Sequence, residues 1–204
     1  MSDNSSIKAV SSKDVFKMIF ESEKVFRVHD DKCIEVKEHS ENVCKICKDI
    51  ALKLKTGGIE VDKKLLKKAA YLHDIGKAYR KGDAHPFMSV IYMYDIFDCS
   101  GEEGKKYAWK LGQIIIAHKG DFCPPEDVAV EAAILRMADK IDKYNKSKYS
   151  LEKAEKSCKK SLKKIKKYFH DNGLDDKFKQ IKTACEDERK EATDKRYSNL
   201  FLCS

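Results

Sequence analysis

Apolar residues recur in this 204-residue chain at steps of three and four, the spacing that buries one face of a helix. Four segments between residues 36 and 139 show this repeat. We find no run of alternating β-branched residues bounded by turns, which is the pattern that predicts a strand. Only three prolines and nine glycines interrupt the chain. The sequence therefore predicts an all-α fold, a helical bundle in which several helices each bury one apolar face.

Residue types that bind metals interrupt all four apolar stripes, and each of them falls on the inward face. They are His39 in the stripe 36–54, His73 with Asp74 at the end of the stripe 66–73, His118 after the stripe 111–115, and Asp139 at the end of the stripe 128–139. Gly76 follows Asp74 at a position where helices commonly end. Separate helices are thus expected to direct polar side chains toward one another.

An ionised carboxylate on an apolar face is costly unless it is paired, hydrogen-bonded or bound to a cation. Asp74 and Asp139 both need such compensation, and a divalent cation between the helices would supply it. Neutral imidazole together with carboxylate suits Zn, Mn, Fe, Ni or Co, whereas Mg and Ca prefer an all-oxygen shell. The residues therefore favour a transition metal.

Each of these residues also has a simpler interpretation. A single inward histidine such as His39 is more often a hydrogen-bonded core residue than a ligand, and Asp74 could cap a loop. Asp139 could form a buried ion pair with one of its neighbours, Arg136, Lys140 or Lys143. Joint occurrence favours the metal site, because three of only six histidines in the chain fall on inward helical positions together with two aspartates.

The run Ala69-Ala70-Tyr71-Leu72-His73-Asp74-Ile75-Gly76-Lys77, preceded by His39 and followed by Met137-Ala138-Asp139-Lys140-Ile141-Asp142, resembles the HD superfamily of metal-dependent phosphohydrolases, in particular its HDIG-bearing branch. The similarity covers roughly residues 32–146. The resemblance implies an all-α HD-domain bundle in which His39, His73, Asp74 and Asp139 bind one metal ion.

A subset of HD enzymes has two more histidines before the final aspartate, and His85 and His118 are similar to that pair. The resemblance implies a second ion there, with Asp74 bridging both, as in YqeK-like dinucleoside tetraphosphate hydrolases and HD-GYP phosphodiesterases. Two departures stand out: only ten residues separate Asp74 from His85, and no GYP sequence follows His118. Cyclic-di-GMP specificity is therefore disfavoured. With a single ion, His85 and His118 would contact phosphate or donate protons.

Such a site predicts a hydrolase of phosphate ester or phosphoanhydride bonds in a nucleotide or another small phosphorylated metabolite. A bound ion would activate water beside Asp74, with one or two ions present. Lys77, three residues later, is the leading candidate for contact with phosphate, and the family resemblance supports it. Arg80, Lys81 and Lys119 are further candidates for substrate binding, although a solvated loop is the favoured interpretation of Arg80 and Lys81.

The rest of the chain surrounds this region. We expect a first helix over 12–26, a break at Gly57-Gly58, a loop over 78–84, and a helix opened by His85 and ended by Gly101. Residues 1–146 form the HD phosphohydrolase domain in this interpretation, with its core at 32–146. Residues 147–204 are expected to form a lysine-rich helical hairpin that packs on the same domain.

The net charge of +8 permits attraction of nucleotides, and it leaves an alternative open. In that alternative the chain is an HD-scaffold binding module for RNA or a signalling nucleotide, which uses the basic C-terminal helices. A solvated lysine face is the favoured interpretation of those helices, and binding of nucleic acid is permitted but not favoured.

Cellular location and redox state are also expectations from the sequence. The longest aliphatic patch, at 114–117, is too short to span a bilayer, so we expect a cytoplasmic protein without a membrane partner. The eight cysteines are expected to be free thiols. Cys44 and Cys47 form a C-x-x-C pair, but they lie in a predicted helix, where ordinary packing is favoured over a redox or zinc role.

Overall fold

The computed structural model describes residues 30–78, 84–96, 100–146 and 148–202, which form seven α-helices and three 3-10 helices without a strand. The elements in chain order are α2 (Asp30–Thr56), α3 (Lys63–Leu72), η1 (Ile75–Ala78), α4 (His85–Ile96), α5 (Gly101–Ala117), η2 (Glu126–Val128), α6 (Ala129–Ile141), η3 (Asp142–Asn145), α7 (Leu151–Asp171) and α8 (Asp175–Leu202). The predicted all-α class is confirmed. The helix expected over 12–26 lies outside the described residues.

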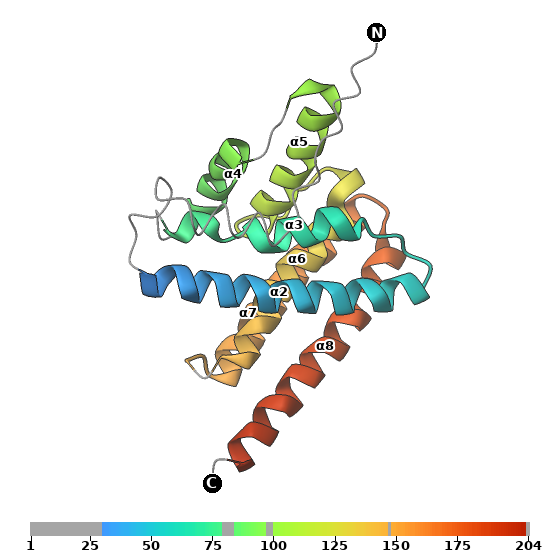
Figure 1. Ribbon diagram of the computed structural model, residues 1–204. Helices are drawn as coiled ribbons and strands as arrows, with labels where there is room; N and C mark the ends of the chain where they lie inside the picture. The colour runs from blue at the N-terminus through green and yellow to red at the C-terminus, as the bar shows by residue number, and fades with distance from the viewer. Residues whose placement is uncertain (1–29, 79–83, 97–99, 147, 203–204) are drawn as a thin grey trace.

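Helix α2 is the long element around which the others are arranged. Figure 1 shows it crossing the molecule with α3 on one side and α8 on the other, and it contacts α3, α6 and α8. Its apolar stripe is buried, with Val43 and Ile50 fully shielded from solvent and Leu54 1 % exposed. The helix break predicted at Gly57-Gly58 is present: α2 ends at Thr56, and Gly58 adopts a φ of 81°, which glycine accommodates readily.

Helix α6 lies at the centre of the bundle and is buried almost all round. It contacts α2, α3, α5, α7 and α8. Small side chains such as Ala132, Ala133 and Ala138 allow these neighbours to approach closely, and each is fully buried. Asp139 is therefore carried on the most enclosed of the described helices.

The predicted C-terminal hairpin is present as α7 and α8. Ser150 caps α7 by accepting a hydrogen bond from the backbone N–H of Lys153, and the chain turns at Gly173, whose φ is 69°. Ile165 and Phe169 of α7 and Ile181 of α8 are fully buried in the same hydrophobic core as α2 and α6. The division of the chain at residue 146 stays a prediction, while the packing of the hairpin is continuous with that core.

Two glycines act differently from the expectation. Gly101 does not end α4, which stops at Ile96; it is the first residue of α5 and has a φ of 74°. Gly76 does not terminate α3 either, because α3 ends at Leu72 and Gly76 lies within η1 without a positive φ. A Cβ at Gly76 would lie 2.7 Å from the backbone nitrogen of Ser89, so its absence lets α4 approach η1.

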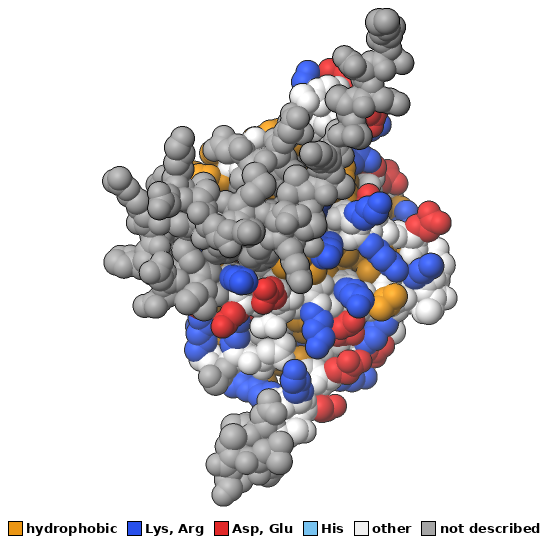
Figure 2. Space-filling view, viewed as in Figure 1, with side chains coloured by type: hydrophobic (Ala, Val, Ile, Leu, Met, Phe, Trp, Pro, Cys, Tyr) orange, Lys and Arg blue, Asp and Glu red, His pale blue; other side chains and the backbone are white. Residues whose placement is uncertain are grey.

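The described surface mixes both signs of charge. On the face shown in Figure 2, basic and acidic side chains alternate with few apolar ones. No described helix combines the length and the apolar character that a membrane crossing requires. Cys44 and Cys47 lie in α2 as predicted, and both are free thiols.

Candidate metal centre

The His73-Asp74 pair is held at the point where α3 ends and η1 begins. Asp62 starts α3 by accepting hydrogen bonds from the N–H groups of Lys64 and Leu65, at 3.0 and 2.9 Å. At the other end, Ser89 of α4 ties the turn down: its Oγ donates to the carbonyl of His73 at 2.8 Å and accepts from the N–H of Gly76 at 2.9 Å. The backbone of the pair is therefore fixed from both sides.

Four of the predicted residues meet in one buried cluster, which we call the first cluster: His39, His73, Asp74 and Asp139. One potential ligand atom from each lies within 4.8 Å of all the others. His39 Nε2 is 3.3 Å from His73 Nε2, 3.1 Å from Asp74 Oδ2 and 3.2 Å from Asp139 Oδ1. Helix α2, the α3–η1 turn and helix α6 thus deliver side chains to one point, as the sequence predicted.

His85 and His118 meet on the opposite side of Asp74 and form, with it, the second cluster. His85 Nε2 lies 3.0 Å from Asp74 Oδ1 and 3.1 Å from His118 Nε2. All three side chains are at most 2 % exposed. Asp74 is the member that the two clusters share, because its Oδ2 faces the first cluster and its Oδ1 faces the second.

Hydrogen bonds on the outer ring nitrogens fix the direction of the imidazoles. His73 Nδ1 donates to the carbonyl of Ala70 at 2.8 Å, and His118 Nδ1 donates to the carbonyl of Ile115. A neutral imidazole that carries its hydrogen on Nδ1 presents a lone pair at Nε2. The Nε2 atoms of both histidines therefore face the cluster interior as electron-pair donors.

The donor set of both clusters fits a divalent cation. Converging imidazole nitrogens and carboxylate oxygens are acceptors that repel one another unless a positive charge lies between them. Asp74 Oδ1 is buried and accepts no hydrogen bond of good geometry, although His85 Nε2 is close to it. This carboxylate oxygen without a hydrogen-bond donor faces two imidazole nitrogens. Such a combination of oxygen and nitrogen donors is typical of a transition-metal site.

The ionisation states of these groups suit the same role. Burial lowers the pKa of His73 to about 3, so its imidazole is neutral at physiological pH. Burial would raise the pKa of Asp74, but the imidazoles around it, His73, His118 and His39, hold it well below its usual range. Burial opposes ionisation of Asp139 in the same way, and Lys140 and His39 outweigh it. Neutral His73 therefore lies beside ionised carboxylates. His39 differs: burial opposes its protonation, but hydrogen bonds to Asp139, Asp142 and Asp74 raise its pKa to about 10, so a cation in the first cluster would replace its proton.

Lysines contact both carboxylates from the outside. Lys77 forms an ion pair with Asp74, and Lys140 forms one with Asp139. The ion pair considered for Asp139 is thus real, and it coexists with the cluster. Arg136, another of the candidate partners, instead donates to the carbonyls of Ala117 and Gly120 at 2.9 and 2.7 Å. It thereby fixes the segment that carries His118 and Lys119.

Asp142 is a site residue that the sequence analysis missed. Its Oδ2 lies 2.7 Å from His39 Nδ1, and Lys146 Nζ approaches the same oxygen at 2.8 Å. The carboxylate is fully buried. Its spacing of three residues from Asp139 placed it on the same helical face, and that signal could have identified it.

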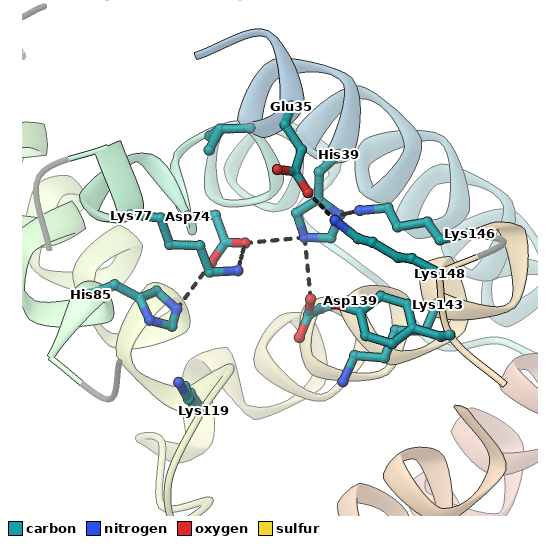
Figure 3. Close-up of a pocket in the computed structure, with 12 residues that line it drawn as sticks. Glu35, His39, Asp74, Lys77, His85, Lys119, Asp139, Lys143, Lys146 and Lys148 are labelled. Atoms are coloured by element: carbon teal, nitrogen blue, oxygen red, sulfur yellow. Dashed lines mark hydrogen bonds and ion pairs between the residues drawn. The ribbon is translucent and has the colours of Figure 1, made fainter. Parts of the chain in front are cut away.

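A pocket of about 270 Å³ opens onto the clusters, as Figure 3 shows. It is lined by Glu35, Val36, His39, Asp74, Lys77, His85, Lys119, Asp139, Lys143, Lys146, Lys148 and Tyr149. Lys77 and Lys119, predicted to bind substrate, are among them, whereas Arg80 and Lys81 lie outside the described residues. Five of the lining residues are lysines, so the pocket suits an anionic ligand.

Comparison with known proteins gives one match. The family described as HD domain matches residues 36–144, which is more than half of the chain. No curated protein and no solved structure matches the chain. The matched range begins three residues before His39 and ends two residues after Asp142, so it contains every member of both clusters.

Proposed function

The chain belongs to the HD domain family, and we propose from this that it is a metal-dependent hydrolase of phosphate ester or phosphoanhydride bonds in a nucleotide or another small phosphorylated metabolite. The observation that carries the proposal is the pair of buried clusters sharing Asp74 at the floor of a pocket lined by five lysines. The clusters supply side chains that can bind cations. The lysines of the pocket supply ammonium groups that can bind phosphate.

The residues divide between two ions in this proposal. His39, His73, Asp74 and Asp139 would hold one divalent ion, and Asp74, His85 and His118 would hold the second. The imidazole-rich donor set favours Mn, Fe, Co, Ni or Zn over Mg. A bound ion of this kind lowers the pKa of water toward neutrality and polarises phosphoryl oxygens.

The protein's own groups would position the substrate. Lys77 and Lys119 reach into the pocket beside Asp74 and His85, so their ammonium groups are placed to bind phosphoryl oxygens and to offset negative charge that develops during reaction. The hydrogen bonds on the Nδ1 atoms of His73 and His118 keep both rings in one orientation. Burial of both clusters limits the water that can enter.

The completeness of the ligand set favours a hydrolase over a binding module for RNA or a signalling nucleotide. A module that had lost catalysis would have no use for two clusters of buried acceptors, each of which lowers stability in the absence of a cation. Salt-sensitive RNA binding without metal-dependent turnover would support the module instead.

Replacement of Asp74 by Ala tests the proposal. Purified protein would be assayed with nucleotides, cyclic nucleotides and dinucleoside polyphosphates in the presence of Mn, Fe, Co, Ni and Mg. We expect metal-dependent phosphate release by the wild type, and none by Asp74→Ala. Asp194→Ala on the exposed face of α8 is the control and should keep the wild-type rate. Equal rates in wild type and Asp74→Ala would place the hydrolytic site elsewhere.

A further inference from the structure

One wall of the pocket comes from the segment that joins α6 to α7. Lys143 lies in η3, and Lys148 and Tyr149 follow it just before Ser150 caps α7. We call Lys143, Lys148 and Tyr149 the lysine wall. Lys148 and Tyr149 lie beyond residue 144, where the HD domain match ends. Lys148 and Tyr149 therefore extend the pocket beyond the matched region.

Lys143 is a half-buried cation without an acidic partner. Its Nζ donates to the hydroxyl of Ser157 at 3.0 Å and lies 5.7 Å from the centre of the Tyr149 ring. No carboxylate among the described residues forms an ion pair with it. Burial and the nearby ammonium group of Lys140 lower its pKa, and the carboxylate of Asp139 offsets this only in part. An anion bound beside Lys143 would offset all of these costs.

Lys148 offers a second ammonium group at the mouth of the pocket. It lies 5.9 Å from the Tyr149 ring centre and forms an ion pair with Glu35. Both partners of that pair are more than half exposed, and exposed pairs of this kind are weak. A phosphate could compete with Glu35 for it. Lys146, by contrast, is held by the buried carboxylate of Asp142.

The lysine wall and the phosphate contacts described above lie on different sides of the pocket. Figure 3 shows Lys143 and Lys148 on the side of His39 and Asp139, while Lys77 and His85 line the opposite side. A monophosphate positioned at the clusters by Lys77 would leave Lys143 without an anion. The cavity of about 270 Å³ is also slightly smaller than pockets for drug-sized ligands. The ligand inside it should be compact.

We propose that the pocket recognises its substrate through two phosphate groups, one reacting at the histidine and aspartate clusters and the other bound by the ammonium groups of Lys143 and Lys148. The substrate class is then a compact metabolite that carries a diphosphate or two separate phosphates. This inference rests on the proposed function for the reacting phosphate, while binding of the second phosphate can be measured without turnover.

Binding of two small probes tests the lysine wall directly. Methylphosphonate and methylenediphosphonate carry one and two phosphonate groups, and neither is a substrate for hydrolysis. Calorimetric titration of the full chain should show at least about tenfold tighter binding of the diphosphonate, since one charge-assisted contact contributes about that factor. Lys143→Gln should remove about tenfold of the diphosphonate affinity and change that for methylphosphonate by less than about twofold.

Lys153→Gln is the matched control. Lys153 is exposed and lies 5.6 Å from the same Tyr149 ring centre, but it does not line the pocket. Lys153→Gln removes one positive charge, as Lys143→Gln does. Any chelation of metal by the diphosphonate would affect all variants equally, so it would not produce a difference between them. Lys148→Gln provides a second test at the wall if Lys143→Gln does not fold, with a loss in the same direction. Equal binding of both probes by the wild type, or equal effects of Lys143→Gln and Lys153→Gln, would overturn the proposal.

Phosphate release distinguishes the failure of this inference from failure of the proposed function. Methyl phosphate, methyl diphosphate and 1,3-propanediol bisphosphate would be compared as substrates of the metal-loaded protein. Similar kcat/KM for all three would overturn the two-phosphate site and leave the hydrolase standing. The diphosphonate preference together with no phosphate release from any phosphorylated compound would overturn the hydrolase and leave the anion site standing.

Discussion

His39 Nδ1 lies 2.7 Å from Oδ2 of Asp142, while Nε2 of the same ring faces Asp74 and Asp139. The contact joins α2 to η3 across 103 residues of sequence. A carboxylate behind a ligating imidazole fixes the ring and increases its electron-donating strength. Asp142 is therefore placed to orient His39 without reaching the cluster itself.

Asp142→Asn should weaken metal retention and turnover by about 10–100-fold, because the amide is a poorer partner for His39 Nδ1. Metal content by elemental analysis and the rate of phosphate release would both be measured. Circular dichroism should show an unchanged helical fold. Asp194→Asn, on an exposed position, is the control. Wild-type metal content in Asp142→Asn would show that the contact does not orient the ligand.

Gly76→Ala should destabilise the protein by about 1–3 kcal/mol and loosen the second cluster. A Cβ at this position would lie 2.7 Å from the backbone nitrogen of Ser89, so α4 and its His85 must move. Urea unfolding and metal content would measure the two effects. Gly112→Ala is a matched control on α5, where the nearest atom to an added Cβ is 3.4 Å away. Similar stability of both variants would contradict the close packing of α4 on η1.

Lys53→Met should lower stability by about 1–3 kcal/mol at pH 7, because it leaves the carboxylate of Glu188 without its partner. Lys53 Nζ lies 2.6 Å from Glu188 and joins α2 to α8. Burial raises the pKa of Glu188, and this outweighs the lowering effect of Lys53. A carboxyl whose pKa is raised on folding favours the folded state below its unfolded pKa, and this contribution is lost as pH rises.

The deficit of Lys53→Met should therefore be largest at pH 7 and should shrink on acidification, because the raised pKa of Glu188 lets it take up a proton above the usual range for Glu. Urea unfolding at pH 7 and at a mildly acidic pH would measure it. Lys105→Met, which removes a well-exposed pair with Glu102, should change stability by less than about 0.5 kcal/mol. A deficit that grows on acidification would contradict the assignment to Glu188.

Phe169→Ala should cost about 3–5 kcal/mol, the usual range for a large side chain removed from a core. The ring is fully buried, and its centre lies 6.4 Å from that of Phe122 and 6.5 Å from that of Phe178. Thermal or urea unfolding would measure the loss. Phe87→Ala, at a position 57 % exposed, is the control. A loss below about 1 kcal/mol would show that α7 contributes little to the common core.

The helices could be predicted because their apolar periodicity is visible within each segment. The clusters could be predicted because several metal-binding residue types fall on buried faces together. Helical periodicity places His39, His73 and Asp139 on buried faces whatever the neighbouring helices are. Several buried acceptors are then satisfied together if they converge on one cation. The resemblance to HD enzymes supplied the remaining step, the inclusion of His85 in the second cluster.

The parts that were missed depend on contacts between distant segments. Asp142 matters through its contact with His39, and Lys148 of the lysine wall contacts Glu35 of α2, which lies 113 residues earlier in the chain. The two glycines show a different reason. A positive φ at Gly101 serves the start of a helix as well as the end of one, and Gly76 is required by the approach of α4 rather than by its own φ.

Anomalous diffraction at the absorption edge of the metal found in the purified protein tests the central claim most directly. We predict a peak at about 2.0–2.2 Å from His39 Nε2, His73 Nε2 and oxygens of Asp74 and Asp139, and a second peak beside His85 and His118. A single peak at the first cluster would leave His85 and His118 to contact phosphate. The absence of any peak beside Asp74 in crystals of metal-loaded protein would contradict the account.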